Sequence, residues 1–196
     1  DLVKQAESHG CVAAASLPDL IGKLTAPRTV WVMVPSGAPT EETVQAVAAL
    51  LQPGDTVIDG GNTRFHDDVR RAADLKKKQL HYIDVGTSGG IWGLKVGYCL
   101  MIGGEEAAVK RLTPVFTTLA PENGWAHVGG HGAGQTMKLW DIADLGNIDL
   151  RGQYIGAAQI PHNVYPKGNL VFVSHYEAGV TVVDISNPDT LVEVAR

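Results

Sequence analysis

Strand-like and helix-like segments alternate along the first two thirds of this chain, and this alternation constrains its fold more than any other feature. Short apolar runs bounded by turn residues predict strands over 29–34, 56–59, 80–85, 98–102 and 126–128. Amphipathic segments between them predict helices over 40–51, 64–78 and 105–119. Such an order implies βαβ units with right-handed crossovers. We therefore expect an α/β fold whose sheet is mostly parallel and covered by helices.

Three of the predicted strands end in polar turns that contain proline or glycine. These turns are Val34-Pro35-Ser36-Gly37, Asp59-Gly60-Gly61-Asn62 and Thr87-Ser88-Gly89-Gly90. Ligands of open parallel sheets bind beyond the carboxyl ends of the strands, and glycine allows main-chain N–H groups to approach a ligand closely. The three turns predict a binding cleft at one rim of the sheet. The alternative is that the glycines belong to ordinary connections between buried strands.

Charge and composition exclude several classes of function. The formal net charge of -5 offers no basic field to a phosphate backbone, so we expect no nucleic-acid partner. No apolar run approaches the length that spans a bilayer, and no signal peptide opens the chain, which predicts no membrane partner. Cys11 and Cys99 lie in patterns typical of core or helix, so we expect reduced thiols and a cytoplasmic location. The seven histidines have no metal-ligand spacing, which predicts no metal site.

The pattern changes at about Met137, where helix-like segments stop and short β-like runs begin. Leu170–Ser174 and Gly179–Val183 predict two strands of a hairpin or meander. A short motif occurs twice, as Trp140-Asp141-Ile142-Ala143-Asp144-Leu145 and as Val183-Asp184-Ile185-Ser186-Asn187-Pro188. The two motifs lie 43 residues apart, which is the period of a four-stranded propeller blade. A small β-rich appendage is therefore expected after the α/β part.

Several motifs of the first part together resemble the decarboxylating 6-phosphogluconate dehydrogenases of the β-hydroxyacid dehydrogenase family. The resemblance covers residues 1 to about 138. Its motifs are Met33-Val34-Pro35, Asp59-Gly60-Gly61-Asn62, Asp84 to Gly93, Gly97 to Gly104, and Gly132-Ala133-Gly134 followed by Lys138. The resemblance implies a Rossmann-like domain and oxidation of 6-phosphogluconate at C3 by NADP or NAD, followed by loss of carbon dioxide to give ribulose 5-phosphate.

The same resemblance assigns roles to individual residues of this sequence. Met33, Val34 and Pro35 would line the nicotinamide. Asn62 and the turn of Ser88, Gly89 and Gly90 would contact the sugar-acid phosphate. Lys138 would be the general base that takes the hydroxyl proton, which requires that its pKa be lowered towards neutrality. The alternative for Lys138 is a solvated lysine without a catalytic role.

The sequence departs from this family at both ends of the matching region. The family opens with a strand, a G-x-G-x-x-G turn and a second strand, none of which is present in this sequence. The family's lysine is followed by His-Asn and then by an acidic glutamate, and a large helical domain comes next. The corresponding positions here hold Asp141, Ile142 and Leu145. We therefore expect a truncated Rossmann-like domain with weak or lost cofactor binding and impaired activity.

The last part of the chain, about 137–196, resembles the LVIVD-repeat β-propeller proteins, whose blades end in a Val-x-Asp-Ile-Ser-x-Pro turn. We expect a division into an incomplete NAD(P)-binding domain over 1–138 and a β-rich, blade-like segment over 139–196. One blade cannot close a propeller, and exposed strand edges favour association, so a homo-oligomer is expected. The alternatives to an enzyme are a non-catalytic binding module and a chimeric fusion of two unrelated fragments.

Overall fold

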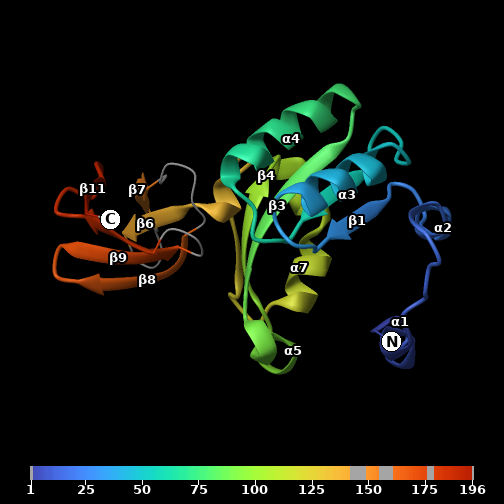
Figure 1. The fold of residues 1–196 in the computed structure, drawn as a ribbon, viewed down its shortest axis with the longest axis horizontal. Helices are drawn as coiled ribbons and strands as arrows, with labels where there is room; N and C mark the ends of the chain where they lie inside the picture. Colours follow the sequence, from blue (N-terminus) through green and yellow to red (C-terminus); the bar gives the residue numbers. More distant parts are fainter. Residues whose placement is uncertain (1, 142–148, 155–160, 176–178, 196) are drawn as a thin grey trace.

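The computed structural model describes residues 2–141, 149–154, 161–175 and 179–195. Its main feature is a five-stranded sheet in the order β1-β2-β3-β4-β5 (Figure 1). The strands are β1 (Thr29–Val32), β2 (Thr56–Asp59), β3 (His81–Ser88), β4 (Cys99–Gly104) and β5 (Trp125–Gly129). β1, β2 and β3 run parallel, β4 runs antiparallel to β3, and β5 is parallel to β4. The expected α/β fold with a mostly parallel sheet is confirmed.

The helices connect the strands and cover both faces of this sheet. They are α1 (Leu2–Ser8), α2 (Leu17–Lys23), α3 (Ala38–Ala48), α4 (Phe65–Lys77), α5 (Gly93–Val96), α6 (Glu106–Arg111) and α7 (Thr113–Leu119), with 3-10 turns η1 (Gly90–Trp92) and η2 (Ala133–Gln135). Ser16 caps α2 by accepting a hydrogen bond from the Asp19 amide at 3.3 Å. The segment expected to form one helix over 105–119 is broken because Pro114 lies in the first turn of α7 and lacks an N–H group.

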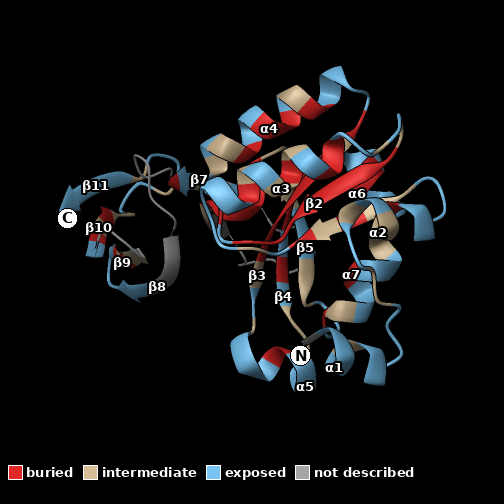
Figure 2. Cartoon of the chain, turned by 45° about the vertical axis from the view of Figure 1, so that its right-hand side comes forward, coloured by how far each residue is buried: buried red, intermediate tan, exposed pale blue. Residues whose placement is uncertain are grey.

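Two hydrophobic cores lie on opposite faces of the sheet. Val57 and Tyr82 point to the face covered by α2, α3 and α4, where they pack with Val44 and Leu75. Their strand neighbours Ile58 and Ile83 point to the other face, which α6 and α7 cover. Figure 2 shows that the sheet interior and the inner sides of these helices are buried. Because the two faces are both apolar, successive strand residues are buried, as the continuous apolar run of β2 predicts.

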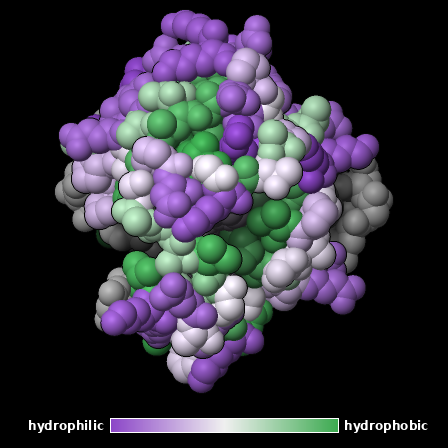
Figure 3. Space-filling model, turned by 90° about the vertical axis from the view of Figure 1, so that its right-hand side faces the viewer, coloured by the Kyte–Doolittle hydropathy of each residue, from purple (hydrophilic) through white to green (hydrophobic). Residues whose placement is uncertain are grey.

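The strand over 29–34 was expected to be buried on both faces, and β1 does not meet this expectation. Only Val30 and Val32 are buried, and Thr29 and Trp31 are half-buried. The reason is position, since β1 forms the edge of the sheet and pairs with β2 alone among the described strands. Figure 3 shows apolar side chains gathered across the middle of the molecular face on the side of α1, α2 and β1.

Cys11 and Cys99 are exposed free thiols, so the expected core location of the cysteines is wrong.

After η2 the described part of the chain contains only strands. β6 (Met137–Asp141) pairs with β7 (Asp149–Tyr154), and a second antiparallel sheet has the order β11-β10-β9-β8. Its strands are β8 (Pro161–Lys167), β9 (Leu170–His175), β10 (Gly179–Asp184) and β11 (Val192–Ala195). Tyr154, Val171, Val173 and Val183 form a small separate core. The predicted β-rich appendage and its hairpin are confirmed, while residues 142–145 of the first repeated motif lie outside the described residues.

No helix among the described residues has the length and apolarity that a membrane crossing requires.

Candidate functional site

The turns after β1 and β2 lie side by side at the carboxyl edge of the parallel strands. Met33, Val34 and Pro35 follow β1, and the side chain of Met33 is 63% exposed. Asn62, which is exposed, follows β2. The two turns touch, because a Cβ atom built on Gly61 would lie 3.1 Å from the Val34 carbonyl oxygen. The structure thus brings together the predicted cofactor-side and substrate-side residues of these two turns.

Ser88, Gly89 and Gly90 lie further along the sheet than the other two turns. Asp59, the last residue of β2, pairs with Asp84, so Ser88 stands four residues beyond the end of β2, roughly 13 Å along the strand. There β3 pairs only with β4 and leads into η1 and α5. The third turn is therefore carried on an extension of β3 beyond the end of β2.

Glycine in this third turn has a packing role as well as a conformational one. Gly89 and Gly90 have φ values of 154° and 47°. A Cβ atom on Gly89 would lie 2.8 Å from the Tyr98 ring, and one on Gly93 would lie 2.1 Å from it. The tyrosine ring thus covers the glycines from one side, which the spacing of glycines in the sequence does not reveal.

Lys138, the predicted general base, lies on β6. Its backbone pairs with that of Gln153 in the β6-β7 ladder. It follows η2 by three residues, so η2 sets the point at which the chain leaves the α/β sheet. The side chain of Lys138 lies outside the part that the structure describes, and its role remains a prediction.

The glycine-dense segment 129–134 has a structural partner that the sequence analysis missed. Asp84, which is fully buried on β3, accepts hydrogen bonds from the amides of Gly132 at 2.7 Å and Gly134 at 2.8 Å. Gly134 packs so closely that a Cβ atom on it would lie 2.4 Å from the Met101 carbonyl oxygen. These amides therefore bind an internal carboxylate. In the sequence, this contact could have been recognised from an aspartate within a predicted buried strand together with a distant run of glycines.

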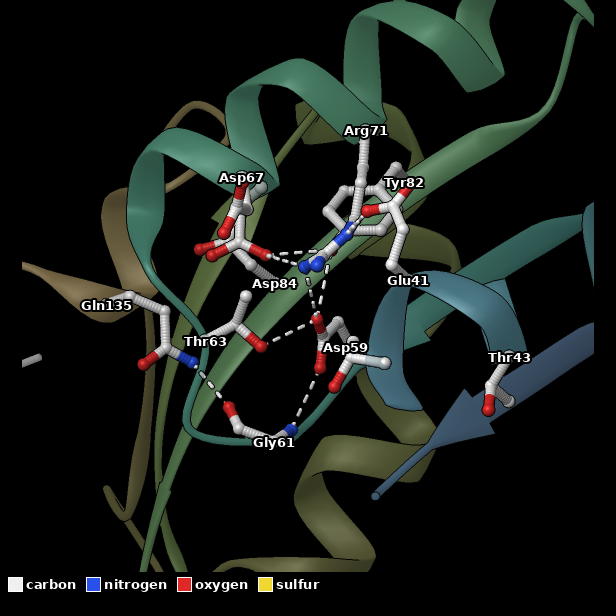
Figure 4. Close-up of polar contacts among 12 residues, drawn as sticks. Glu41, Thr43, Asp59, Gly61, Thr63, Asp67, Arg71, Tyr82, Asp84 and Gln135 are labelled. Atoms are coloured by element: carbon white, nitrogen blue, oxygen red, sulfur yellow. Dashed lines mark hydrogen bonds and ion pairs between the residues drawn. The ribbon is translucent and has the colours of Figure 1, made fainter. Parts of the chain in front are cut away.

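A buried polar cluster supports the Asn62 turn from the side of α4 (Figure 4). Asp59 accepts hydrogen bonds from the Gly61 amide at 3.0 Å and the Thr63 hydroxyl at 2.8 Å. The guanidinium of Arg71 lies 3.3 Å from Asp59 and 2.9 Å from Glu41, which belongs to α3. The cluster thus ties the turn after β2 to two helices on one face of the sheet.

Asp68 and Tyr82 complete this cluster in the interior. The Tyr82 hydroxyl donates to Asp68 at 2.7 Å, and Arg71 lies 3.8 Å from the same oxygen. Burial, with the neighbouring Asp84 and Asp59, raises the pKa of Asp68 to about 9. Hydrogen bonding from Arg70 lowers the pKa of Glu41 to about 2. Asp68 is therefore protonated at neutral pH, while Glu41 carries the charge that faces Arg71.

Asp68→Asn is expected to make the protein more stable above neutral pH. Between pH 4, the pKa region of an unfolded aspartate, and pH 9, the folded chain holds a proton that the unfolded chain releases. The contribution of Asp68 to the free energy of unfolding therefore falls as pH rises through this window. Asparagine keeps the oxygen that accepts from Tyr82 and does not titrate. We expect the variant's advantage to increase by about 1 kcal/mol per pH unit between pH 5 and 8.

Urea denaturation at pH 5, 6.5 and 8 measures this difference. Asp67→Asn is the matched control, because Asp67 is adjacent, partly exposed and 3.4 Å from Arg70. We expect the control to change stability by less than about 1 kcal/mol, without the same trend. An advantage of Asp68→Asn that is independent of pH would contradict a protonated Asp68.

The fold and the rim together define a dinucleotide-binding domain of the Rossmann-like class, with polar turns beyond parallel strands that helices cover on both faces. The family model of the NAD binding domain of 6-phosphogluconate dehydrogenase matches residues 1–129, and the chain belongs to this family. Among the described residues, no group of three His, Cys, Asp or Glu side chains is arranged to hold a metal ion.

Curated relatives with similar sequences are dehydrogenases. The chain is 36% identical to a putative 6-phosphogluconate dehydrogenase of Bacillus subtilis over 137 residues, which is 70% of this chain and 46% of that protein. It is 37% identical to a decarboxylating 6-phosphogluconate dehydrogenase of Schizosaccharomyces pombe over 145 residues, covering 70% of this chain and 29% of the relative. It is also 37% identical to an NAD(+)-dependent decarboxylating enzyme of Haloferax volcanii, with 71% and 46% covered. The chain spans less than half the length of these relatives.

Solved structures agree with this assignment. The 6-phosphogluconate dehydrogenase of Plasmodium falciparum superposes with a TM-score of 0.61 at 26% identity, covering 67% of this chain and 29% of that one. The 3-hydroxyisobutyrate dehydrogenase of Mycobacterium tuberculosis gives the same TM-score and identity, covering 67% and 44%.

Proposed function

We propose that this chain binds NADP or NAD together with 6-phosphogluconate, as part of a dehydrogenase that oxidises this sugar-acid phosphate and releases carbon dioxide. The main observation that supports this proposal is the contact between the Met33–Pro35 turn and the Asn62 turn at the carboxyl edge of the sheet, in a chain that belongs to this family. Relatives whose names state decarboxylating activity support the substrate and the reaction class.

The residues at the rim fit this proposal. Met33 and Pro35 are exposed and offer an apolar surface on which a nicotinamide ring can lie, and Gly61, which has no side chain, allows the Asn62 turn to pack against the Val34 carbonyl. The bound cofactor would supply the hydride acceptor. Asn62 would hydrogen-bond the sugar acid from the middle of the rim, and the turn of residues 88–90 would contact it from the β3 extension. Lys138 would take the proton of the C3 hydroxyl.

The β-rich part of the chain supports a second candidate function, that of a binding module. We propose a domain boundary at 138/139 and a blade-like segment over 139–196. β8, β9, β10 and β11 form a consecutive four-stranded meander, as a propeller blade does. Asp184 accepts from the Ser186 amide at 2.8 Å in the turn of the repeated motif. The outer strands β1, β8 and β11 offer edges for a homo-oligomer, and the two free thiols suit a cytoplasmic location.

An absorbance assay of the reduced nicotinamide, with 6-phosphogluconate and either NADP or NAD, separates these functions. Turnover that depends on Lys138, tested with Lys138→Ala, supports the enzyme. Saturable binding of NADP without turnover supports the binding module. If neither cofactor nor 6-phosphogluconate binds at millimolar concentration, the proposed function is wrong.

A further inference from the structure

One buried side chain, Gln135, connects the Asn62 turn to strand β3. Gln135 ends η2 and is 8% exposed. Its amide nitrogen donates to the carbonyl oxygen of Gly61 at 2.9 Å (Figure 4). It also donates to the carbonyl oxygen of Val85 at 3.4 Å. Since both partners are acceptors, the amide orientation is determined by the contacts. A single side chain thus links the end of β2 to the middle of β3.

One of these carbonyl groups immediately precedes a predicted substrate contact, and the other lies on the strand that leads to the second predicted contact region. The Gly61 carbonyl is part of the peptide bond to Asn62. The preceding peptide is held as well, because the Gly61 amide donates to Asp59 at 3.0 Å. Gln135 and Asp59 therefore fix the backbone on both sides of Gly61. The Val85 carbonyl lies three residues before Ser88, on the strand whose extension carries the third turn.

The segment that carries Gln135 is itself firmly held. Asp84 accepts from the amides of Gly132 and Gly134, on either side of Ala133. The Thr136 hydroxyl donates to the Ala133 carbonyl at 3.1 Å. A Cβ atom on Gly86 would lie 2.3 Å from the Gly134 carbonyl oxygen, so backbone packs directly on backbone. The backbone of Gln135 is therefore held in place, and its amide can restrain the Asn62 turn and β3.

We propose that Gln135 is a positioning residue, which cross-links the Asn62 turn to β3 and thereby sets the geometry in which the sugar-acid phosphate is bound. This inference rests on the proposed roles of Asn62 and Ser88 in substrate binding. Removing the amide releases the Gly61 and Val85 carbonyl groups, so we expect 6-phosphogluconate binding to weaken about tenfold, which corresponds to about 1.4 kcal/mol.

Gln135→Met tests this inference, because the methionine side chain is similar to that of glutamine in length and volume but cannot donate a hydrogen bond. Gln153→Met is the matched control. Gln153 lies nearby and donates to the Thr136 hydroxyl at 2.8 Å, without a described contact to either turn. In amide ¹H–¹⁵N spectra of the full chain we expect the Asn62 and Gly86 resonances to shift in Gln135→Met and to stay in place in Gln153→Met. Titration with 6-phosphogluconate should show a tenfold loss of affinity in Gln135→Met and no loss in Gln153→Met.

The wild-type protein gives a test that requires no variant. The side-chain amide protons of Gln135 are expected to show nuclear Overhauser contacts to the Asn62 and Gly86 amide protons. Absent contacts, or unchanged Asn62 and Gly86 resonances in a folded Gln135→Met, would overturn the positioning role. If 6-phosphogluconate fails to bind the wild type while these resonances do shift, the proposed substrate is wrong and the cross-link stands. Equal loss of affinity in both variants would also overturn the proposal.

Discussion

Arg71→Met is expected to lower the free energy of unfolding by about 3–5 kcal/mol, which is the usual effect of removing one partner from a buried ion pair. The Arg71 side chain is 1% exposed and contacts Glu41, Asp59 and Asp68. Without the guanidinium, the buried Asp59 carboxylate loses the ion pair that the described structure gives it. Asp68 is already protonated at neutral pH, so it adds little to this effect. Urea denaturation at pH 7 measures the loss.

Arg70→Met is the control for this prediction, because it removes the same kind of side chain from the neighbouring position. Arg70 also bonds Glu41, at 2.6 Å, but its side chain is 48% exposed. We expect a loss of at most about 1 kcal/mol, as for other exposed ion pairs. Equal losses at pH 7 would show that the Arg71 cluster is not a buried ion pair.

Gly86→Ala is expected to lower the free energy of unfolding by about 3 kcal/mol, the upper end of the range for an added methyl group in a packed core. The new methyl carbon would lie 2.3 Å from the Gly134 carbonyl oxygen and 3.1 Å from the Met101 side chain. Met101 can move its end, whereas the Gly134 backbone is held by Asp84 at 2.8 Å. The substitution therefore has to displace the η2 segment from the sheet.

Gly130→Ala lies in the same region and serves as the comparison in thermal or urea denaturation. A Cβ atom on Gly130 has no neighbour within 4 Å, so we expect a change within about 0.5 kcal/mol. Gly86→Ala should also shift the amide resonances of residues 132–135. A Gly86→Ala variant as stable as wild type would contradict the direct backbone packing between β3 and η2.

The hydrophobic pattern was sufficient to predict the strands and most of the helices of the α/β part, because each strand contains a short apolar run. It could not show that β1 is an edge strand or that β4 runs antiparallel, since strand order and direction depend on long-range pairing. Pro114 in the sequence indicates that the 105–119 segment divides into two helices, but this sign was not used in the prediction. β3 also extends four residues beyond the end of β2. This extension is strand because it pairs with β4, and the local sequence does not determine it.

The rim turns could be located from sequence because glycine and asparagine after an apolar run mark strand ends. The residues that support these turns could not. Asp84 and Gln135 are 51 positions apart, although Asp84 holds the segment that carries Gln135. Arg71 is one charged residue among many on α4. Their burial results from packing of distant elements. Polar residues inside buried strands and helix faces are the local sign that such a cluster exists.

The proposed site is tested most directly by adding NADP, and separately 6-phosphogluconate, to the ¹⁵N-labelled chain and following its amide resonances. We predict saturable shifts at Met33 and Val34 with the cofactor, and at Asn62 and residues 88–90 with the sugar acid. Glucose 6-phosphate, which carries the phosphate without the carboxylate, should give smaller shifts. Saturable shifts confined to other faces of the sheet, or none at millimolar concentration of either ligand, would contradict a sugar-acid dehydrogenase site at this rim.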